Sequence, residues 1–127
     1  MLTFSLNHIA LSVKDVDESI EFYQKALHLK EIKNTASNSK TRWLSLGEWK
    51  QLHLIPRQNA EIKTNKAVHF ALATADIESF VNHLKELKIE YSDWLDTIKK
   101  DYIRKDGIKQ VYFQDPNGYW IEVNEDI

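Results

Sequence analysis

Three histidines and one glutamate supply the residue types from which a metal site could be built. His8, His53 and His69 each carry an imidazole, and Glu122 carries a carboxylate. Imidazoles and carboxylates are ordinary ligands for divalent ions such as Zn, Ni, Fe or Mn, and ligand type alone does not choose among these metals. Such a ligand set would leave an octahedral ion two open positions, enough for a substrate that binds through two oxygens. These four residues are therefore the candidate metal ligands.

The four residues occupy equivalent places in an internal repeat. The tetrapeptide starting at His8 reads His-Ile-Ala-Leu, and the one starting at His69, 61 positions later, reads His-Phe-Ala-Leu. His53 and Glu122 lie 69 positions apart, and each stands between two apolar residues after the bend of a predicted hairpin. Two copies of a strand-helix-strand-hairpin unit therefore share one chain.

Alternating polarity predicts which face of each strand the candidate ligands occupy. Four predicted strands place a ligand opposite a face of apolar side chains: 6–13 with His8, 51–55 with His53, 67–73 with His69 and 119–123 with Glu122. The helical spacing of apolar residues predicts one helix over about 16–28 and another after Asp76. If each helix covers the apolar face of its own sheet, all four ligands project from uncovered faces.

The remaining segments complete the two units. The clearest element is the hairpin over residues 110–124, which bends at Asp115-Pro116-Asn117-Gly118. Other strands are predicted over 29–33, 41–46, 89–91 and around 94–98. We expect one α+β domain over 1–127, with module 1 at about 4–56, a polar linker at about 57–66 and module 2 at about 67–125.

Composition excludes several classes of function. A chain of 127 residues with 17 basic and 19 acidic side chains spread along it has no basic patch for nucleic acid. Because it has no cysteine, disulfides, thiolate metal sites and a cysteine nucleophile are excluded. Its start lacks a signal-like segment and it has no run of 18 apolar residues, so we expect a cytoplasmic protein with no membrane partner.

Each candidate ligand also has an ordinary structural interpretation. A single histidine on a strand is more often structural than a ligand, and His28 and His83, on predicted helices, are given only that role. Four such groups at equivalent places are different, because each unmet buried polar group costs about 1–3 kcal/mol. Four of them would consume most of the roughly 5–15 kcal/mol that stabilises a domain. A shared metal satisfies them together and is the favoured hypothesis.

Three stretches carry a resemblance to a known family. They read Leu-Asn-His-Ile-Ala-Leu-Ser-Val-Lys-Asp at 6–15 leading into Ser-Ile-Glu-Phe-Tyr at 19–23, Val-His-Phe-Ala-Leu at 68–72, and Phe-Gln-Asp-Pro-Asn-Gly-Tyr-Trp-Ile-Glu at 113–122. The chain thereby resembles, over nearly its whole length, the vicinal oxygen chelate superfamily of glyoxalase I, bleomycin-resistance proteins, extradiol dioxygenases and fosfomycin-resistance transferases. The resemblance implies paired βαβββ modules that form a cupped mixed sheet with helices on its outer face, and a homodimer that can exchange modules. It places the divalent metal on His8, His53, His69 and Glu122.

The resemblance also implies a function. It favours a metal-dependent enzyme acting on a small substrate that chelates the metal through oxygens, with His53 and Glu122 as candidate catalytic residues. A glyoxalase I-like lyase or isomerase comes first. An iron(II) extradiol-type dioxygenase is the alternative enzyme, and a metal-free small-molecule or drug-binding protein of the bleomycin-resistance kind is the alternative from another class.

The chain departs from its nearest family patterns at two places. Glyoxalase I has a glutamate that moves the substrate proton where this chain has His53; an unligated imidazole, with an ordinary pKa of about 6.5, could replace it. Fosfomycin-resistance enzymes carry a basic residue in a tail beyond the position of Ile127, and a serine- and glycine-rich potassium loop that residues 92–107 do not show.

Substrate contacts are predicted on aromatic residues and on one long charged loop. Trp43, Tyr112 and Trp120 could line a pocket, together with Arg104 from the loop at 92–107. That loop also carries Lys99 and Lys100 and is the expected place for substrate recognition, because long loops in compact domains are often functional. The alternative interpretation is a solvated charged loop.

Overall fold

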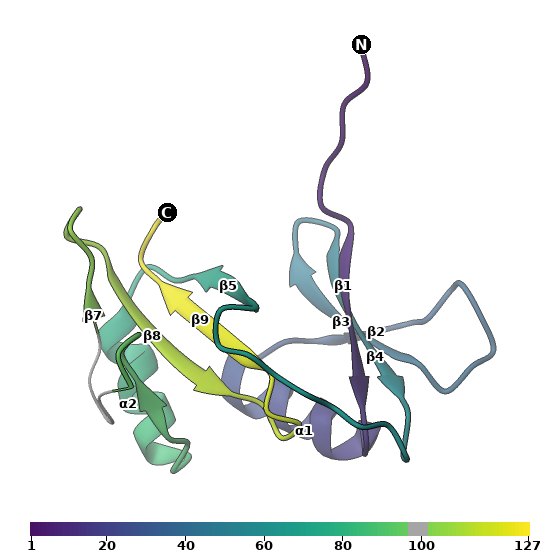
Figure 1. Ribbon diagram of the computed structural model, residues 1–127. Helices are drawn as coiled ribbons and strands as arrows, with labels where there is room; N and C mark the ends of the chain where they lie inside the picture. Colours follow the sequence, from purple (N-terminus) through teal and green to yellow (C-terminus); the bar gives the residue numbers. More distant parts are fainter. Residues whose placement is uncertain (97–101) are drawn as a thin grey trace. The chain divides into compact units, whose positions relative to one another are not determined.

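The computed structural model describes residues 1–96 and 102–127 and divides into two compact units, Met1–Ile62 and Lys63–Ile127 (Figure 1). The elements of the first unit are β1 (His8–Val13), α1 (Val16–Leu27), β2 (Glu31–Ile32), β3 (Arg42–Gly47) and β4 (Lys50–Pro56). Those of the second unit are β5 (His69–Ala73), α2 (Ile77–Glu86), β6 (Tyr91–Ser92), β7 (Tyr102–Ile103), β8 (Lys109–Gln114) and β9 (Trp120–Asn124).

The two units share one topology. The first sheet has the strand order β1-β4-β3-β2 and the second has β5-β9-β8-β6, with β7 also paired to β8. In each sheet the first and last strands of the unit, β1 with β4 and β5 with β9, are parallel neighbours, and the other pairs are antiparallel. Each unit is therefore a βαβββ module with a mixed sheet. The predicted α+β fold class is confirmed, while the closure of both sheets into one cup stays a prediction.

Aspartate caps begin both helices. The Asp15 carboxylate accepts a hydrogen bond from the Glu18 backbone N–H at 3.1 Å, and the Asp76 carboxylate accepts one from Ser79 at 3.0 Å. A capping side chain satisfies one of the backbone donors that the first helical turn leaves unpaired. The two caps are 61 positions apart, so the repeat extends to the helix starts.

Each helix covers the apolar face of its own sheet. In the first unit α1 packs on β3 and β4, and Leu52 and Leu54 of β4 are fully buried. In the second unit the ring of Phe80 on α2 lies 5.6 Å from that of Phe113 on β8, and Ile121 on β9 is fully buried. Because side chains alternate between faces along a strand, the candidate ligands lie on the opposite, uncovered faces.

Two predicted strands differ from the structure. The strand predicted over 89–91 begins only at Tyr91, because the Ile89 N–H donates to the Leu84 carbonyl at 3.0 Å and so belongs to the end of α2. The strand predicted around 94–98 is wrong where it is described: Trp94 and Leu95 form a turn closed by the Asp96 N–H on the Asp93 carbonyl at 3.2 Å. Residues 97 and 98 lie outside the described residues.

Neither of the two helices in the described part of the chain has both the length and the apolar character needed to cross a bilayer.

Candidate metal site

His8 and His53 stack on each other in the first unit. β1 and β4 run parallel in a register that pairs Ala10 with His53, which brings His53 next to His8 on the uncovered face. Their ring centroids are 4.0 Å apart with 12° between the ring planes. The other face of the His53 ring lies on Trp43, its partner across β3 and β4, at 4.2 Å and 2°. His53 is therefore held as the middle ring of a three-ring stack.

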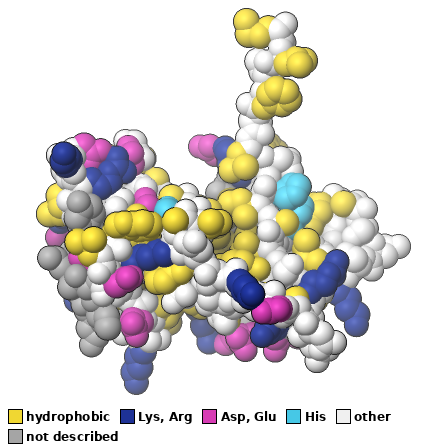
Figure 2. All heavy atoms as spheres, in the orientation of Figure 1, with side chains coloured by type: hydrophobic (Ala, Val, Ile, Leu, Met, Phe, Trp, Pro, Cys, Tyr) yellow, Lys and Arg dark blue, Asp and Glu magenta, His cyan; other side chains and the backbone are white. Residues whose placement is uncertain are grey.

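Hydrogen bonds distinguish the two imidazoles. His8 Nδ1 lies 2.7 Å from the amide oxygen of Asn7, and His53 Nε2 lies 2.8 Å from the amide oxygen of Gln51. An amide oxygen only accepts, so each of these ring nitrogens carries the proton. The free lone pair is then on Nε2 in His8 and on Nδ1 in His53. Burial and the nearby His8 lower the pKa of His53, which keeps its imidazole neutral near pH 7. Figure 2 shows histidine side chains at the surface beside the extended N-terminal segment.

His69 and Glu122 form the corresponding pair in the second unit. β5 and β9 repeat the parallel register, pairing Ala71 with Glu122 as Ala10 pairs with His53. His69 Nδ1 donates to the Lys66 carbonyl at 2.8 Å, which fixes its proton on Nδ1 and leaves the lone pair on Nε2. That Nε2 lies 3.4 Å from Glu122 Oε1.

The Glu122 carboxylate is almost fully buried and is held at both oxygens. Only 7% of the residue is exposed. The Tyr112 hydroxyl donates to Oε1 at 2.7 Å, and the Asn124 amide donates to Oε2 at 2.6 Å. Burial and the hydrogen bond to Glu122 raise the pKa of Tyr112, so the phenol keeps its proton and donates. Two neighbours thus orient the carboxylate, as outer partners commonly do around a metal-ligating group.

The His69–Glu122 pair fits a bound divalent cation. In the neutral imidazole with its proton on Nδ1, His69 directs a lone pair at a carboxylate oxygen 3.4 Å away, and a cation or a second ring proton between these two acceptors relieves their repulsion. Two ligand atoms about 2.0–2.1 Å from one ion are separated by roughly 2.8–3.4 Å at octahedral to tetrahedral angles. The donor chemistry and the spacing therefore both suit a metal such as zinc or nickel.

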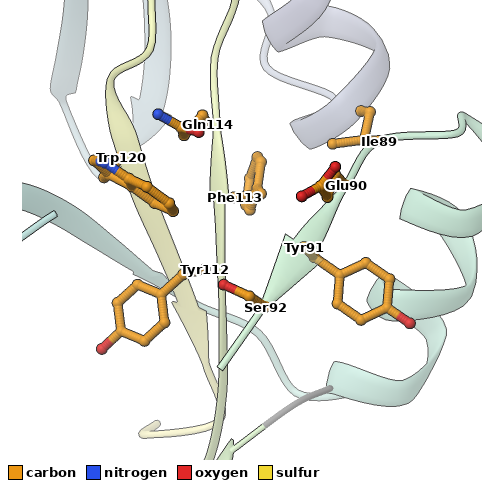
Figure 3. A pocket seen from close by; sticks show the side chains of 8 residues that line it. All are labelled: Ile89, Glu90, Tyr91, Ser92, Tyr112, Phe113, Gln114 and Trp120. Carbon is orange, nitrogen blue, oxygen red and sulfur yellow. The ribbon is translucent and has the colours of Figure 1, made fainter. Parts of the chain in front are cut away.

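Two pockets lie in the described part of the second unit, and one of them contains this pair. One, of about 350 Å³, is lined by His69, Trp94, Leu95, Gln110, Tyr112 and Glu122. The other, of about 210 Å³, is lined by Ile89, Glu90, Tyr91, Ser92, Tyr112, Phe113, Gln114 and Trp120. Figure 3 shows Tyr112 and Tyr91 directed to opposite sides of the sheet. Tyr112 lines both pockets.

The structure brings the predicted ligands together in pairs. Neither unit, over the residues described in it, gathers three or more His, Asp or Glu side chains that could hold a metal. The four-ligand set of His8, His53, His69 and Glu122 therefore stays a prediction.

The predicted substrate contacts fall in different surroundings. Tyr112 and Trp120 line pockets, whereas Trp43 is buried against His53. Arg104 donates to Asp106 and lies 3.5 Å from Asp126. Lys99 and Lys100 lie outside the described residues, so recognition by the loop at 92–107 stays a prediction.

Several contributors were not predicted from the sequence. Gln51 and Asn124 stand two positions from His53 and Glu122, on the same strand faces, so alternation alone could have found them. Lys66 and Trp94 carry no local signal, because their contacts in the site come from residues distant in the sequence.

Comparison with known proteins places the chain in a family. The model of the Glyoxalase/Bleomycin resistance protein/Dioxygenase superfamily matches residues 5–123. A metallothiol transferase FosB from Staphylococcus epidermidis is 30% identical, covering 94% of this chain and 80% of the relative. Glyoxylase I 4 from Arabidopsis thaliana is 30% identical, covering 94% of this chain and 69% of the relative.

Solved structures show the same fold. The fosfomycin resistance protein FosX from Listeria monocytogenes has a TM-score of 0.76 at 21% identity, covering 97% of this chain and 93% of that one. Lactoylglutathione lyase from Agrobacterium tumefaciens has a TM-score of 0.71 at 18% identity, covering 96% and 93%. Topology, repeat and family model agree, and the chain belongs to the Glyoxalase/Bleomycin resistance protein/Dioxygenase superfamily, the vicinal oxygen chelate superfamily.

Proposed function

We propose that this protein is a divalent-metal-dependent enzyme that binds a small substrate through its oxygens. His8 and His69, through Nε2, and Glu122 would hold the metal. The observation that carries the proposal is the position of His69 Nε2, 3.4 Å from Glu122 Oε1, while Nδ1 is engaged by the Lys66 carbonyl. His8 has the same protonated Nδ1 as His69, 61 positions away, which supports equivalent roles for the two residues.

The chain's own side chains would prepare the site before substrate arrives. Tyr112 and Asn124 hold the carboxylate, while the Asn7 amide and the Lys66 carbonyl fix the two imidazoles. A metal bound there would act as a Lewis acid on the substrate oxygens. Ligands whose orientation is fixed in advance bind a metal more tightly than mobile ones.

His53 would serve as a fourth ligand or as the proton acceptor. Its ring is neutral, is clamped between Trp43 and His8, and has its lone pair on Nδ1 rather than Nε2. That difference from His8 and His69 favours the role of proton acceptor for His53. A general base of this kind typically raises the rate of the reaction about 10²- to 10⁴-fold. In a His53→Gln variant, a lost base lowers kcat at unchanged metal affinity, whereas a lost ligand lowers the metal affinity itself.

The leading reaction is a glyoxalase-type isomerisation or lyase reaction on the adduct of an α-oxoaldehyde and a thiol. The similarity to Glyoxylase I 4 supports it. A second candidate is transfer of a thiol to a small electrophile, favoured by the 30% identity to the metallothiol transferase FosB. An iron(II) extradiol-type dioxygenase and a metal-free binding protein are the remaining alternatives.

Each unit supplies two of the four groups, so a complete site requires two units. They can come from one chain or from both chains of a homodimer, and we propose the homodimer because dimers are common in this superfamily.

The test is activity after controlled metal loading. Metal-stripped protein would be reloaded with zinc, nickel, manganese or iron(II) and assayed with α-oxoaldehyde–thiol adducts, with a thiol plus an electrophile, and with catechols. Turnover of the adduct by a peroxide-resistant zinc or nickel form supports the lyase or isomerase. Catechol cleavage by a peroxide-sensitive iron form would replace it with the dioxygenase. Ligand binding that ignores chelator, with no turnover, would replace both with the binding protein.

A further inference from the structure

Lys66 lies in the turn that leads into β5, within the segment predicted to be only a polar linker. The turn is closed by the Val68 N–H on the Asn65 carbonyl at 2.8 Å, and the Ala67 N–H bonds the Asn65 side chain at 2.9 Å. The Lys66 carbonyl accepts the Nδ1 proton of His69 at 2.8 Å. The backbone of Lys66 therefore sets which nitrogen of His69 is free to bind a metal.

The ammonium of Lys66 is held by several contacts. It donates to the Asp93 carbonyl at 2.9 Å and to Ser92 Oγ at 3.3 Å, and it pairs with the Asp96 carboxylate at 2.5 Å. Three rings surround the same ammonium, with centroids at 4.8 Å for Trp120, 5.2 Å for Tyr112 and 5.7 Å for Trp94. Only 14% of the side chain is exposed.

Three acceptors match the three protons of an ammonium, so Lys66 has no proton left for a substrate anion. Its contacts are instead internal ones. They join the entry of β5, where His69 stands, to the turn after β6 that carries Trp94 and Leu95. Trp94 and Leu95 are walls of the pocket that contains His69 and Glu122.

We propose that Lys66 is a positioning residue for this half of the site: it holds His69 in its metal-binding tautomer and fixes the Trp94 wall over the pocket. The part that concerns metal binding rests on the function proposed above. The tautomer and the wall position do not, since both are properties of the metal-free protein.

The absence of cysteine from the chain allows a chemically exact test. In a Lys66→Cys variant, 2-bromoethylamine alkylates the single thiol, losing bromide and leaving an ammonium at about the reach of lysine. The alkylation is done on the unfolded chain, which is then refolded, and wild type passes through the same steps. Lys85→Cys, on the exposed side of α2, is the matched control for alkylation.

Two readouts are measured on every form. Long-range proton–nitrogen NMR of the histidine rings at pH 8, without metal, reports which nitrogen of His69 carries the proton. Competition with a chromogenic chelator reports the Zn²⁺ affinity. Lys66→Cys keeps the backbone carbonyl that binds His69 but removes the side-chain contacts that fix the turn carrying this carbonyl. We expect the freed turn to give mixed His69 tautomers and a Zn²⁺ affinity about 10- to 100-fold weaker, the range for disturbing an outer partner of a metal ligand. Aminoethylation should restore both.

The outcomes separate the two proposals. An unchanged tautomer and affinity in Lys66→Cys, or losses that aminoethylation does not reverse, overturn the role of Lys66 while the metal site stands. If wild type binds neither Zn²⁺ nor nickel, manganese or iron(II), yet the tautomer changes and is restored, the metal proposal fails and the positioning role stands. Should Lys66→Cys not refold, two other variants test the same contacts. Ser92→Ala removes one acceptor of the ammonium, and Asp96→Asn keeps an acceptor oxygen but removes the negative charge of the ion pair. Both should shift the two readouts in the same direction by a smaller factor, and no shift in either variant would overturn the proposal.

Discussion

Replacing Tyr112 with phenylalanine isolates the hydrogen bond that holds the buried carboxylate. Tyr112 is 4% exposed and donates to Glu122 Oε1 at 2.7 Å. The ring of the variant keeps the packing, so the loss is confined to one hydrogen bond to a charged acceptor. Such a bond contributes about 1.5–3 kcal/mol when its partner stays buried. Tyr112→Phe should therefore destabilise the metal-free protein by that amount.

This loss of free energy of unfolding corresponds to a decrease in the melting temperature. An unfolding entropy of about 2.1 cal/mol/K per residue gives roughly 0.27 kcal/mol/K for this chain of 127 residues. The expected decrease in Tm is then about 6–11 °C, measured by calorimetry in the presence of chelator. In a metal titration the same variant should bind Zn²⁺ about 10- to 100-fold more weakly, because Glu122 loses the donor that orients it.

Tyr91→Phe is the matched control for this experiment. Tyr91 is also 4% exposed and lies on β6, beside Tyr112 in the sheet but pointing to the other face (Figure 3). It makes no hydrogen bond through its side chain to the residues that the structure describes, so its Tm should change by less than about 2 °C, as for substitutions away from specific features. Equal Tm losses in both variants, or a loss under 2 °C in Tyr112→Phe, would refute the reasoning about the carboxylate.

Three further variants test other parts of the structure. Gly118→Ala should lower the free energy of unfolding by about 1–2 kcal/mol, since φ at this position is +89° and the new methyl would lie 3.3 Å from the Thr64 hydroxyl oxygen. Urea unfolding measures the difference. An unchanged free energy of unfolding would contradict a strained turn at Gly118. Arg42→Met removes a two-bond ion pair with Glu31 and should cost about 1 kcal/mol. Hydrogen bonding to Arg42 lowers the pKa of Glu31. The ion pair therefore stabilises the folded protein fully above the ordinary glutamate pKa, and this stabilisation is lost as the pH falls through the lowered pKa of Glu31. If Arg42→Met remained less stable than wild type at the lowest pH, the assignment of the loss to this ion pair would be contradicted. Finally, His8→Ala and Glu122→Ala chains can be co-expressed so that they form mixed dimers. If modules are exchanged, one of the two sites in a mixed dimer carries both substitutions and the other carries neither, so up to half of the metal should return. No return of metal would mean that each site lies within one chain.

The fold followed from patterns that are local in the sequence. Asp15 and Asp76 cap the helices where the apolar spacing begins, and period-two alternation assigns each strand a covered and an uncovered face. The repeat relating His8 to His69 recurs in the structure as two identical parallel registers. These features depend on neighbours a few residues apart, which is why the sequence alone predicts them.

The parts that were missed depend on contacts between distant residues. The acceptors of Lys66 lie 26 to 30 positions away, so nothing near Lys66 in the sequence distinguishes it from an ordinary linker lysine. Trp94 was predicted on a strand because its neighbours suit strands, but the Asp93–Asp96 turn prevailed. Tyr112 lies opposite Glu122 because of the register of the β8–β9 hairpin. This register depends on where β8 ends and β9 begins, and the sequence does not fix those two ends to the residue.

The most direct test of the account is the metal content of the purified, untagged protein, measured by elemental analysis for wild type and for His8→Ala, His69→Ala and Glu122→Ala. One transition metal per chain in wild type, and its loss in all three variants, is the predicted result, because residues from both units would share one ion. Two metals per chain, each lost only when its own unit is altered, would contradict a shared site. No metal in wild type, even after incubation with zinc, nickel, manganese or iron, would contradict the metal-dependent enzyme itself.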